Sequence, residues 1–444
     1  MSLLPSNPGN ALADQAAYLR TLPAIRERCT RVHELGQQGK LQYFDYHQDK
    51  EAEAVDFCLS IINRDFGSDF ASIPPHGRWR HLDAGRPRVE PLVAKWEATA
   101  NSPDKKEVCR RLIDLFVVSV LLDAGAGGAW GYVEDGGQRF SRSEGLGVAS
   151  FDMFAQGMFS SDPNNPHQTD AKGLASVGAP ALAKAMQVSD SNPMVGLEGR
   201  AELLIRLGGA LKEGKEFFGG GETARIGNLV DFLEAQSVTS NGSHVVPVAA
   251  LWAALIESLN PIWPPSRTSL AGVSLGDVWP CEALRQASPG ESEADILVPF
   301  HKLTGWTTYS VLEPMEKILG WTFEGKDQLT GLPEYRNGGL LVDHGILTLK
   351  VNPPTPIPVD DKYGLPKIPP SHPAIIEWRA MTVIELDRLA EQIRSKLGLN
   401  TTQLTLAQVL ESATWKGGRE IAKVKRPQTG GGPPIEIVSD GTVF

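Results

Sequence analysis

The chain has 444 residues, of which 41% are hydrophobic and 22% are charged, a balance typical of globular proteins with a large core. Its formal net charge of −10 at pH 7 argues against a nucleic-acid-binding surface, although a local basic pocket for a small anion remains compatible with it. The four cysteines lie far apart in the sequence without metal-type spacing, so we expect free buried thiols rather than disulfides or a zinc site.

Targeting segments, a P-loop motif and a zincin motif are not evident. Residues 1–22 lack the basic and apolar regions of a signal peptide, and no apolar run reaches the roughly 18 residues of a membrane span. The patterns GxxxxGK[ST] and HExxH do not occur, which gives no support to a P-loop enzyme or a zincin. We therefore expect a cytoplasmic protein without a membrane partner.

Helical periodicity dominates the chain. Apolar residues recur three or four positions apart, with glycine or proline near the ends, over residues 104–125, 199–214, 243–261, 293–320, 372–398 and 405–418. Two-residue alternation is rare, and its best example covers residues 345–351. These patterns predict a mainly α fold with a few short strands.

The composition predicts three parts. Residues 1–350 form a main helical body with the pocket, residues 351–373 form a semi-rigid proline-rich connector, and residues 374–444 supply C-terminal helices and a tail packed on the body. The tail combines a basic cluster, a glycine run and an apolar end, so it either lies on another surface or is disordered.

A first polar cluster is "HGRWRHLDAGRPR", residues 76–88. Arg78 has donors suited to phosphate or carboxylate, and Trp79 has a flat face suited to a planar ligand. A surface loop tied by Arg–Asp ion pairs explains the same residues equally well. Metal binding by His76, His81 and Asp83 is a weaker alternative, because their spacing is not diagnostic.

Two further segments carry candidate pocket residues. Asp123 follows a strongly apolar helix and precedes a glycine-rich turn, so its carboxylate either holds that turn or reaches a cavity. In "PFHKLTGWTTYSVLEPME", residues 299–316, helical spacing places His301 and Lys302 near Trp306. Lys302 either meets an anionic group or extends from an apolar helix to solvent.

The densest polar run is "LTGLPEYRNGGLLVDHGIL", residues 329–347. It contains Glu334, Tyr335, Arg336, Asn337, Asp343 and His344. We interpret Pro333 and the Gly338-Gly339 pair as breakers that present the first of these side chains at the edge of an apolar segment. Asp343 is a second carboxylate of the site, the partner of a core arginine or the cap of a turn, and His344 has no assigned role.

Several of these segments together resemble a known family. "RWRHLDAG", "PFHKLTGWTTYSVLEPME", "LTGLPEYRNGGLLVDHGIL" and the terminal "GGGPPIEIVSDGTVF" are similar to the signature segments of the domain of unknown function 1688 family. The resemblance covers nearly the whole chain. It implies a cytoplasmic role in an oxygen-independent route of uracil breakdown, in which a ribosylurea compound has to be split.

A more distant resemblance concerns the same run and the preceding "FHK". Both are similar to segments of the queuosine-salvage nucleotide N-glycosidases, which implies a helical core like that of DNA glycosylases and hydrolysis of an N-ribosidic bond. In that family the segment reads Asp-Tyr-Arg, so Glu334 stands where the family has aspartate. The resemblance implies that Glu334 is catalytic and that Lys302 holds a 5-phosphate.

These inferences give one predicted site. Glu334 and Asp343 are the predicted catalytic carboxylates, because breaking a C1–N bond develops positive charge on the sugar that an anion stabilises. The predicted substrate-binding residues are Lys302, His301, Tyr335, Arg336, Asn337, Trp306, Arg78, Trp79, His81 and Asp123. Trp79 and Trp306 would be walls, and Tyr335 and Arg336 would hold ribose hydroxyls or position Glu334.

The predicted function is hydrolysis of a ribosylurea-type nucleotide derivative into urea and ribose phosphate, without a metal or another cofactor. The partner is a small phosphorylated ribose compound rather than nucleic acid. A metal-dependent amide or ureide hydrolase, and a nucleotide-sensing protein without turnover, remain alternatives. The sequence predicts no oligomeric state.

Overall fold

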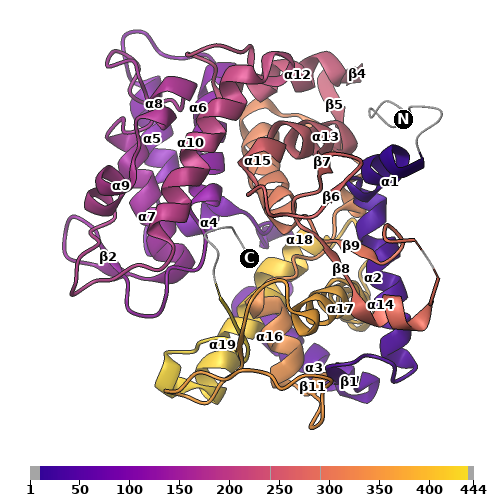
Figure 1. Ribbon diagram of the computed structural model, residues 1–444. Helices are drawn as coiled ribbons and strands as arrows, with labels where there is room; N and C mark the ends of the chain where they lie inside the picture. The colour runs from indigo at the N-terminus through magenta and orange to yellow at the C-terminus, as the bar shows by residue number, and fades with distance from the viewer. Residues whose placement is uncertain (1–10, 241, 291, 439–444) are drawn as a thin grey trace.

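Helices dominate the computed structural model, which describes residues 11–240, 242–290 and 292–438 (Figure 1). The first ten α-helices are α1 (Ala11–Leu19), α2 (Leu22–Gln37), α3 (Glu51–Phe66), α4 (Arg78–Leu82), α5 (Val89–Glu97), α6 (Lys105–Leu121), α7 (Arg142–Ala155), α8 (Ala171–Ala175), α9 (Ala179–Ala185) and α10 (Leu197–Glu213). They are followed by α11 (Lys215–Phe218), α12 (Leu229–Gln236), α13 (Val248–Ser258), α14 (Glu282–Ala287), α15 (Lys302–Leu319), α16 (Tyr335–Asp343), α17 (Pro373–Leu397), α18 (Leu406–Val409) and α19 (Trp415–Lys425). The predicted mainly α fold is confirmed.

The strands are short and form small separate sheets. They are β1 (Phe44–Tyr46), β2 (Tyr132–Val133), β3 (Arg139–Phe140), β4 (Val238–Ser240), β5 (Ser243–Pro247), β6 (Ser269–Leu270), β7 (Val273–Ser274), β8 (Val278–Pro280), β9 (Leu297–Pro299), β10 (Thr322–Glu324), β11 (Leu347–Leu349), β12 (Lys367–Ile368) and β13 (Glu436–Ile437). β10, β5 and β4 form a three-stranded sheet, while β1 pairs antiparallel with β11 and β12 pairs parallel with β13. The strand predicted within residues 345–351 is confirmed as β11.

The best-predicted helices begin and end as their sequences indicate. The carboxylate of Asp104 accepts a hydrogen bond from the backbone N–H of Glu107 and caps α6, whose residues after Ile113 are buried on all sides. The side chain of His372 caps α17 in the same way, and α17 ends at Gly398, which adopts φ +69°. Residues 405–418 are helical too, with a π-helical turn at Leu410–Thr414 between α18 and α19.

Two predicted helices were too long at their N-terminal ends. Residues 243–247 form β5, and the helix begins only after Pro247 as α13. Residues 297–299 form β9, and α15 begins at Lys302 after His301, which adopts the left-handed φ of +44°. Both errors arise because a short apolar run has the same composition in a strand as in a helix, and the pairing partner lies elsewhere in the chain.

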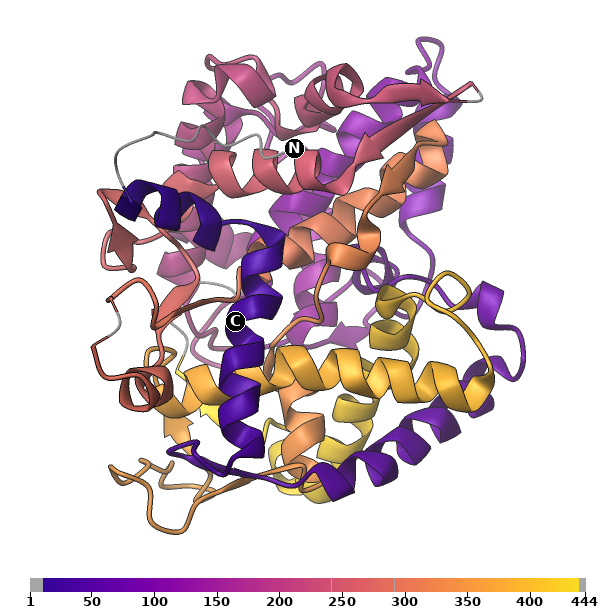
Figure 2. The ribbon, with the colours of Figure 1, turned by 90° about the vertical axis from the view of Figure 1, so that its right-hand side faces the viewer.

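The N-terminal helices α2 and α3 lie beside the C-terminal helices α16, α17 and α19 on one side of the molecule (Figures 1 and 2). α2 crosses α17, the longest helix, and α16 packs against both α17 and α19. The helices α4 to α10 gather on the other side (Figure 1). One continuous hydrophobic cluster runs through both sides, from Leu22 to Ile435.

Within the described part of the chain, no helix is both long enough and apolar enough to cross a membrane. The relation of the helical core to DNA glycosylases stays a prediction.

Candidate functional site

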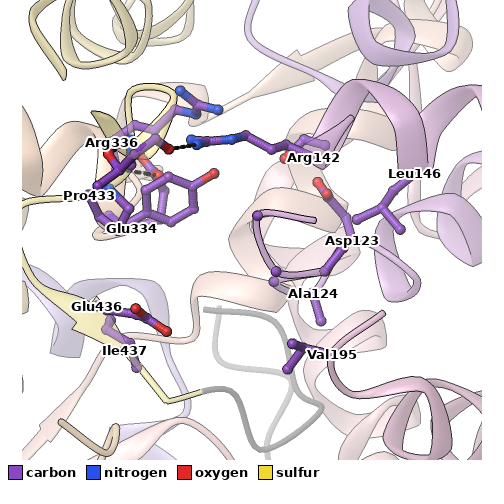
Figure 3. A pocket seen from close by; sticks show the side chains of 18 of the residues that line it. Asp123, Ala124, Arg142, Leu146, Val195, Glu334, Arg336, Pro433, Glu436 and Ile437 are labelled. Carbon is purple, nitrogen blue, oxygen red and sulfur yellow. Dashed lines mark hydrogen bonds between the residues drawn. The ribbon is translucent and has the colours of Figure 1, made fainter. Parts of the chain in front are cut away.

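A cavity of about 320 Å³ lies between the two sides of the molecule (Figure 3). Its walls come from α4, the loop after α6, α7, the start of α15, the start of α16, the connector, α19 and the C-terminal segment. The charged and aromatic residues that line it are His76, His81, Asp123, Arg142, Lys302, Trp306, Glu334, Tyr335, Arg336, Asp360, Tyr363, Trp415 and Glu436. Seven of the predicted site residues are thereby brought together: His81, Asp123, Lys302, Trp306, Glu334, Tyr335 and Arg336.

Glu334 is the N-cap of α16. Its Oε2 accepts the backbone N–H of Arg336 and its Oε1 accepts that of Asn337, both at 2.7 Å. The carboxylate is only 8% exposed, and burial raises its pKa above the ordinary 4.5, although these N–H donors and the charges of Lys302 and Arg336 act in the opposite direction. The cap therefore fixes the orientation of a buried carboxylate that keeps further lone pairs for a ligand.

Lys302 is the first residue of α15 and is 6% exposed. Its backbone N–H donates to Asp277 at 3.0 Å, whereas its ammonium group makes no hydrogen bond or ion pair with any described residue. Burial lowers its pKa below the ordinary 10.5, opposed by the charges of Asp123 and Glu334. A buried ammonium beside two carboxylates is thus available to a ligand in the cavity.

Asp123 is the second carboxylate of the cavity. It lies just after α6 and before the glycine-rich loop 124–128, which also lines the cavity. Its Oδ2 accepts a hydrogen bond from Nη1 of the fully buried Arg78 at 2.7 Å, and Nε of Arg78 donates to Ser119. Arg78 therefore lies outside the cavity lining and orients the carboxylate of Asp123.

An aromatic group forms another wall. The ring of Trp306 lies 4.7 Å from that of His76 and 5.5 Å from that of His81, measured between centroids. Trp415 lies 5.3 Å from His81 and completes the group. His76, His81, Trp306 and Trp415 all line the cavity.

Four other predicted residues lie outside the cavity lining. Trp79 donates to Asp83, and its ring packs against Phe116 with Lys317 over its face, so it is not a wall. The other three are His301, Asn337 and Arg78. His301 faces the carbonyl of Leu19 at 2.8 Å, and the amide of Asn337 donates to the carbonyl of Leu332.

The structure separates Asp343 from the cavity. Both of its carboxylate oxygens accept hydrogen bonds from Arg426, in a buried ion pair at the far end of α16. This is the core-arginine role that the sequence left open as an alternative. Asp123, rather than Asp343, is the carboxylate that accompanies Glu334.

Two of the residues considered for a metal, His76 and Asp83, have other partners. Nδ1 of His76 pairs with Glu411 at 2.6 Å, while Asp83 accepts hydrogen bonds from Trp79 and from backbone N–H groups. Across residues 11–240, 242–290 and 292–438, no group of three or more His, Cys, Asp and Glu side chains is arranged to hold a metal ion. The set His76, His81 and Asp83 therefore does not form a metal centre in this structure.

Comparison with known proteins places the chain in a family. The family described as "Protein of unknown function (DUF1688)" matches residues 18–444. The chain belongs to the DUF1688 family. The resemblance seen in the sequence is thereby confirmed.

Two curated relatives match the DUF1688 chain over nearly their full lengths. "Uracil catabolism protein 4" of Lachancea kluyveri is 43% identical over 440 residues, covering 96% of this chain and 98% of the relative. "Protein urg3" of Schizosaccharomyces pombe is 41% identical over 433 residues, covering 97% and 99%.

Several lining residues of the DUF1688 chain were not predicted. Arg142 extends from the start of α7, with a φ of +56°, and donates to the carbonyls of Thr429, Gly430 and Gly431 (Figure 3). Trp415 comes from a predicted helix for which the sequence indicated no site role. The C-terminal "GGGPPIEI" segment gave a usable signal, because it is one of the segments that resemble the family, and Pro433 lines the cavity.

Proposed function

We propose that this protein hydrolyses the N-ribosidic bond of a ribosylurea-type nucleotide derivative in uracil catabolism, forming urea and ribose phosphate. The name of the Lachancea kluyveri relative supports the pathway. The observation that carries the reaction is the juxtaposition, in one cavity, of an oriented buried carboxylate, Glu334, and an unpartnered buried ammonium, Lys302.

The reaction needs one water molecule. As the bond between C1 and the urea nitrogen breaks, its electron pair stays with urea, and positive charge develops on the sugar ring. Glu334 stabilises this charge and takes a proton from the water that attacks C1. Lys302 donates a proton to the leaving urea, and its lowered pKa makes that donation easier. Proton transfer from Glu334 to Lys302 then restores both groups.

Asp123 has a supporting role in this proposal. Held by Arg78, it adds negative charge near Lys302 and the ribose. The negative charge favours the protonated form of Lys302, and the carboxylate oxygens of Asp123 accept hydrogen bonds from sugar hydroxyls. The rings of His81 and Trp306 form part of the cavity wall around a small urea group.

The activity is tested by incubating the purified protein with ribosylurea 5-phosphate while urea and ribose 5-phosphate are quantified separately. We expect the two products in equal amounts. Release of ammonia without urea would instead identify an amide or ureide hydrolase, with metal analysis and chelation as the next steps. Tight binding without any product would identify a nucleotide-sensing protein.

A plot of kcat/KM against pH should be bell-shaped. Its acidic limb should lie at a higher pH, and its alkaline limb at a lower pH, than the ordinary pKa values of glutamate and lysine would give. Glu334 has to be ionised, so activity should rise through a pKa above 4.5; Lys302 has to be protonated, so activity should fall through a pKa below 10.5. The profile is measured for the unmodified protein and for Lys302→Arg. The arginine variant should be slower and should lack the alkaline limb; an unchanged alkaline limb would assign that limb to another group.

A further inference from the structure

A second cavity of about 180 Å³ adjoins the first. The two share Arg142, Ser143, Arg336 and Trp415 in their linings. The remaining residues of the second cavity are Ser141, Glu144, Arg419, Lys423, Gly430 and Gly431. We call this space the side cavity. Its lining contains four cationic side chains and a single carboxylate.

Arg336 is the most informative of these cations. It is 6% exposed, and its guanidinium group makes no hydrogen bond or ion pair with any described residue. Its contacts are stacking contacts, with Cζ 5.2 Å from the ring centroid of Trp415 and 5.2 Å from that of Tyr335. Stacking fixes the plane of the guanidinium group and leaves its N–H donors for an acceptor from outside the chain.

The start of α7 supplies a second element that favours an anion. The first N–H groups of any α-helix lack intrahelical acceptors, and Ser141, the N-cap of α7, provides no side-chain cap. Ser141, Arg142, Ser143 and Glu144 all line the side cavity. The positive end of the dipole of α7, a helix of 14 residues, therefore lies at the side cavity, which Arg336 also lines.

The other cations reinforce this charge. Burial lowers the pKa of Arg142, and the charges of Arg336 and Arg419, which line the same cavity, lower it further. Glu144 pairs with Arg419 and neutralises only one of them. Lys423 lines the cavity from the exposed face of α19. The net charge of this lining is therefore positive.

We propose that the side cavity binds the phosphate of a phosphomonoester substrate, with Arg336, Arg142, Lys423 and the N-terminus of α7 as its ligands. This inference rests on the proposed function, and it identifies the substrate as a 5-phosphorylated ribosylurea compound rather than the free riboside. Glu334 and Arg336 are two residues apart at the start of α16, so the reacting bond and the phosphate are held by adjoining parts of one element. In this assignment Lys302 acts at the urea end and not on the phosphate.

The experiment measures binding by titration calorimetry on the full chain, with ribose 5-phosphate, ribose and inorganic phosphate as separate probes. The variants are Arg336→Gln and Lys423→Gln. The control is Lys425→Gln, an exposed lysine on the same helix that does not line either cavity. We expect Arg336→Gln and Lys423→Gln each to weaken ribose 5-phosphate binding by about tenfold or more, with no change in Lys425→Gln.

Because Lys423 is exposed, its variant should fold normally even if Arg336→Gln does not. Equal affinity of Lys423→Gln and the unmodified protein for ribose 5-phosphate would overturn the proposal. Binding of inorganic phosphate but not of ribose 5-phosphate would also overturn it, since the site would then serve a free anion.

Turnover separates this proposal from the proposed function. If ribosylurea 5-phosphate is not hydrolysed but ribose 5-phosphate binding depends on Lys423, the phosphate site stands and the hydrolase proposal fails. If hydrolysis occurs and Lys423→Gln raises KM only for the phosphorylated substrate, both stand. Equal increases of KM for ribosylurea and its 5-phosphate would contradict the phosphate site but not the hydrolase proposal.

Discussion

Glu334→Gln is expected to lower kcat for ribosylurea 5-phosphate by at least about 10³-fold, because the amide neither stabilises a positively charged sugar ring nor accepts a proton from water. Substrate affinity should change much less, since the side chain keeps its size. Steady-state kinetics, with urea release as the signal, measures both parameters. If the Glu334→Gln protein were active, Glu334 would not be required for the reaction.

The control for this variant addresses the capping role of Glu334. Glutamine retains one acceptor oxygen for the backbone N–H groups of Arg336 and Asn337, so a loss of roughly 1 kcal/mol in the free energy of unfolding is expected. Asp104→Asn makes the same acid-to-amide change at the N-cap of α6, away from the cavity. It should leave kcat unchanged. Thermal unfolding of both variants separates lost capping from lost chemistry.

Gly418→Ala is expected to destabilise the protein by about 3 kcal/mol, at the upper end of the usual cost of overpacking. A Cβ atom on Gly418 would lie 2.1 Å from the backbone oxygen of Arg336 and 2.7 Å from its carbonyl carbon, so α19 would have to move away from α16. Denaturant unfolding measures the loss. The same displacement would disturb Arg336 and therefore weaken ribose 5-phosphate binding.

The matched control is Gly209→Ala. Gly209 lies within α10 and is exposed, and a Cβ atom added to it would have no neighbouring atom within 4 Å. Alanine is the better helix former, so this variant should gain about 0.5–1 kcal/mol. If Gly418→Ala were as stable as Gly209→Ala, the close approach of α19 to α16 would not be a constraint on the fold.

The sequence predicts those elements whose signals are local. α17 carries its own cap and stop and was predicted almost to the residue, and the start of α6 was predicted from its cap Asp104, although α6 ends at Leu121, before the predicted stop at Gly125. β5 and β9 were missed because a strand of three to five residues is defined by its partner, which for β5 is β10 and β4. Pairing between distant segments leaves no periodic pattern in either one.

The glycine pair after Arg336 shows a different limit. Gly338 and Gly339 were interpreted as breakers, but α16 continues through both. A Cβ atom on Gly338 would lie 2.7 Å from the ring of Trp378, whose Nε1 donates to the carbonyl of Gly338. The glycine is therefore needed for close packing on α17 rather than for a turn, a distinction that depends on a residue 40 positions away.

The lining of the cavity could be predicted only in part, because some of its residues are determined by contacts between segments far apart in the chain. Glu334, Tyr335 and Arg336 are consecutive, so one segment indicated all three, and Lys302 came from a second recognisable segment. Choosing between Asp123 and Asp343 required knowing where α16 ends relative to Arg426. Arg142 gave no sequence signal at all, because its role follows from the direction of α7 in space.

The crossing of α2 by α17 affects how the chain folds during its synthesis. Leu22, Ile25, Cys29 and Val32 of α2 are buried in a core that includes residues of α17, more than 300 positions later in the chain. During translation this apolar face emerges long before its partner, a condition that favours aggregation or chaperone binding. Glu436 and Ile437 also line the cavity, so its lining is complete only after synthesis has almost finished.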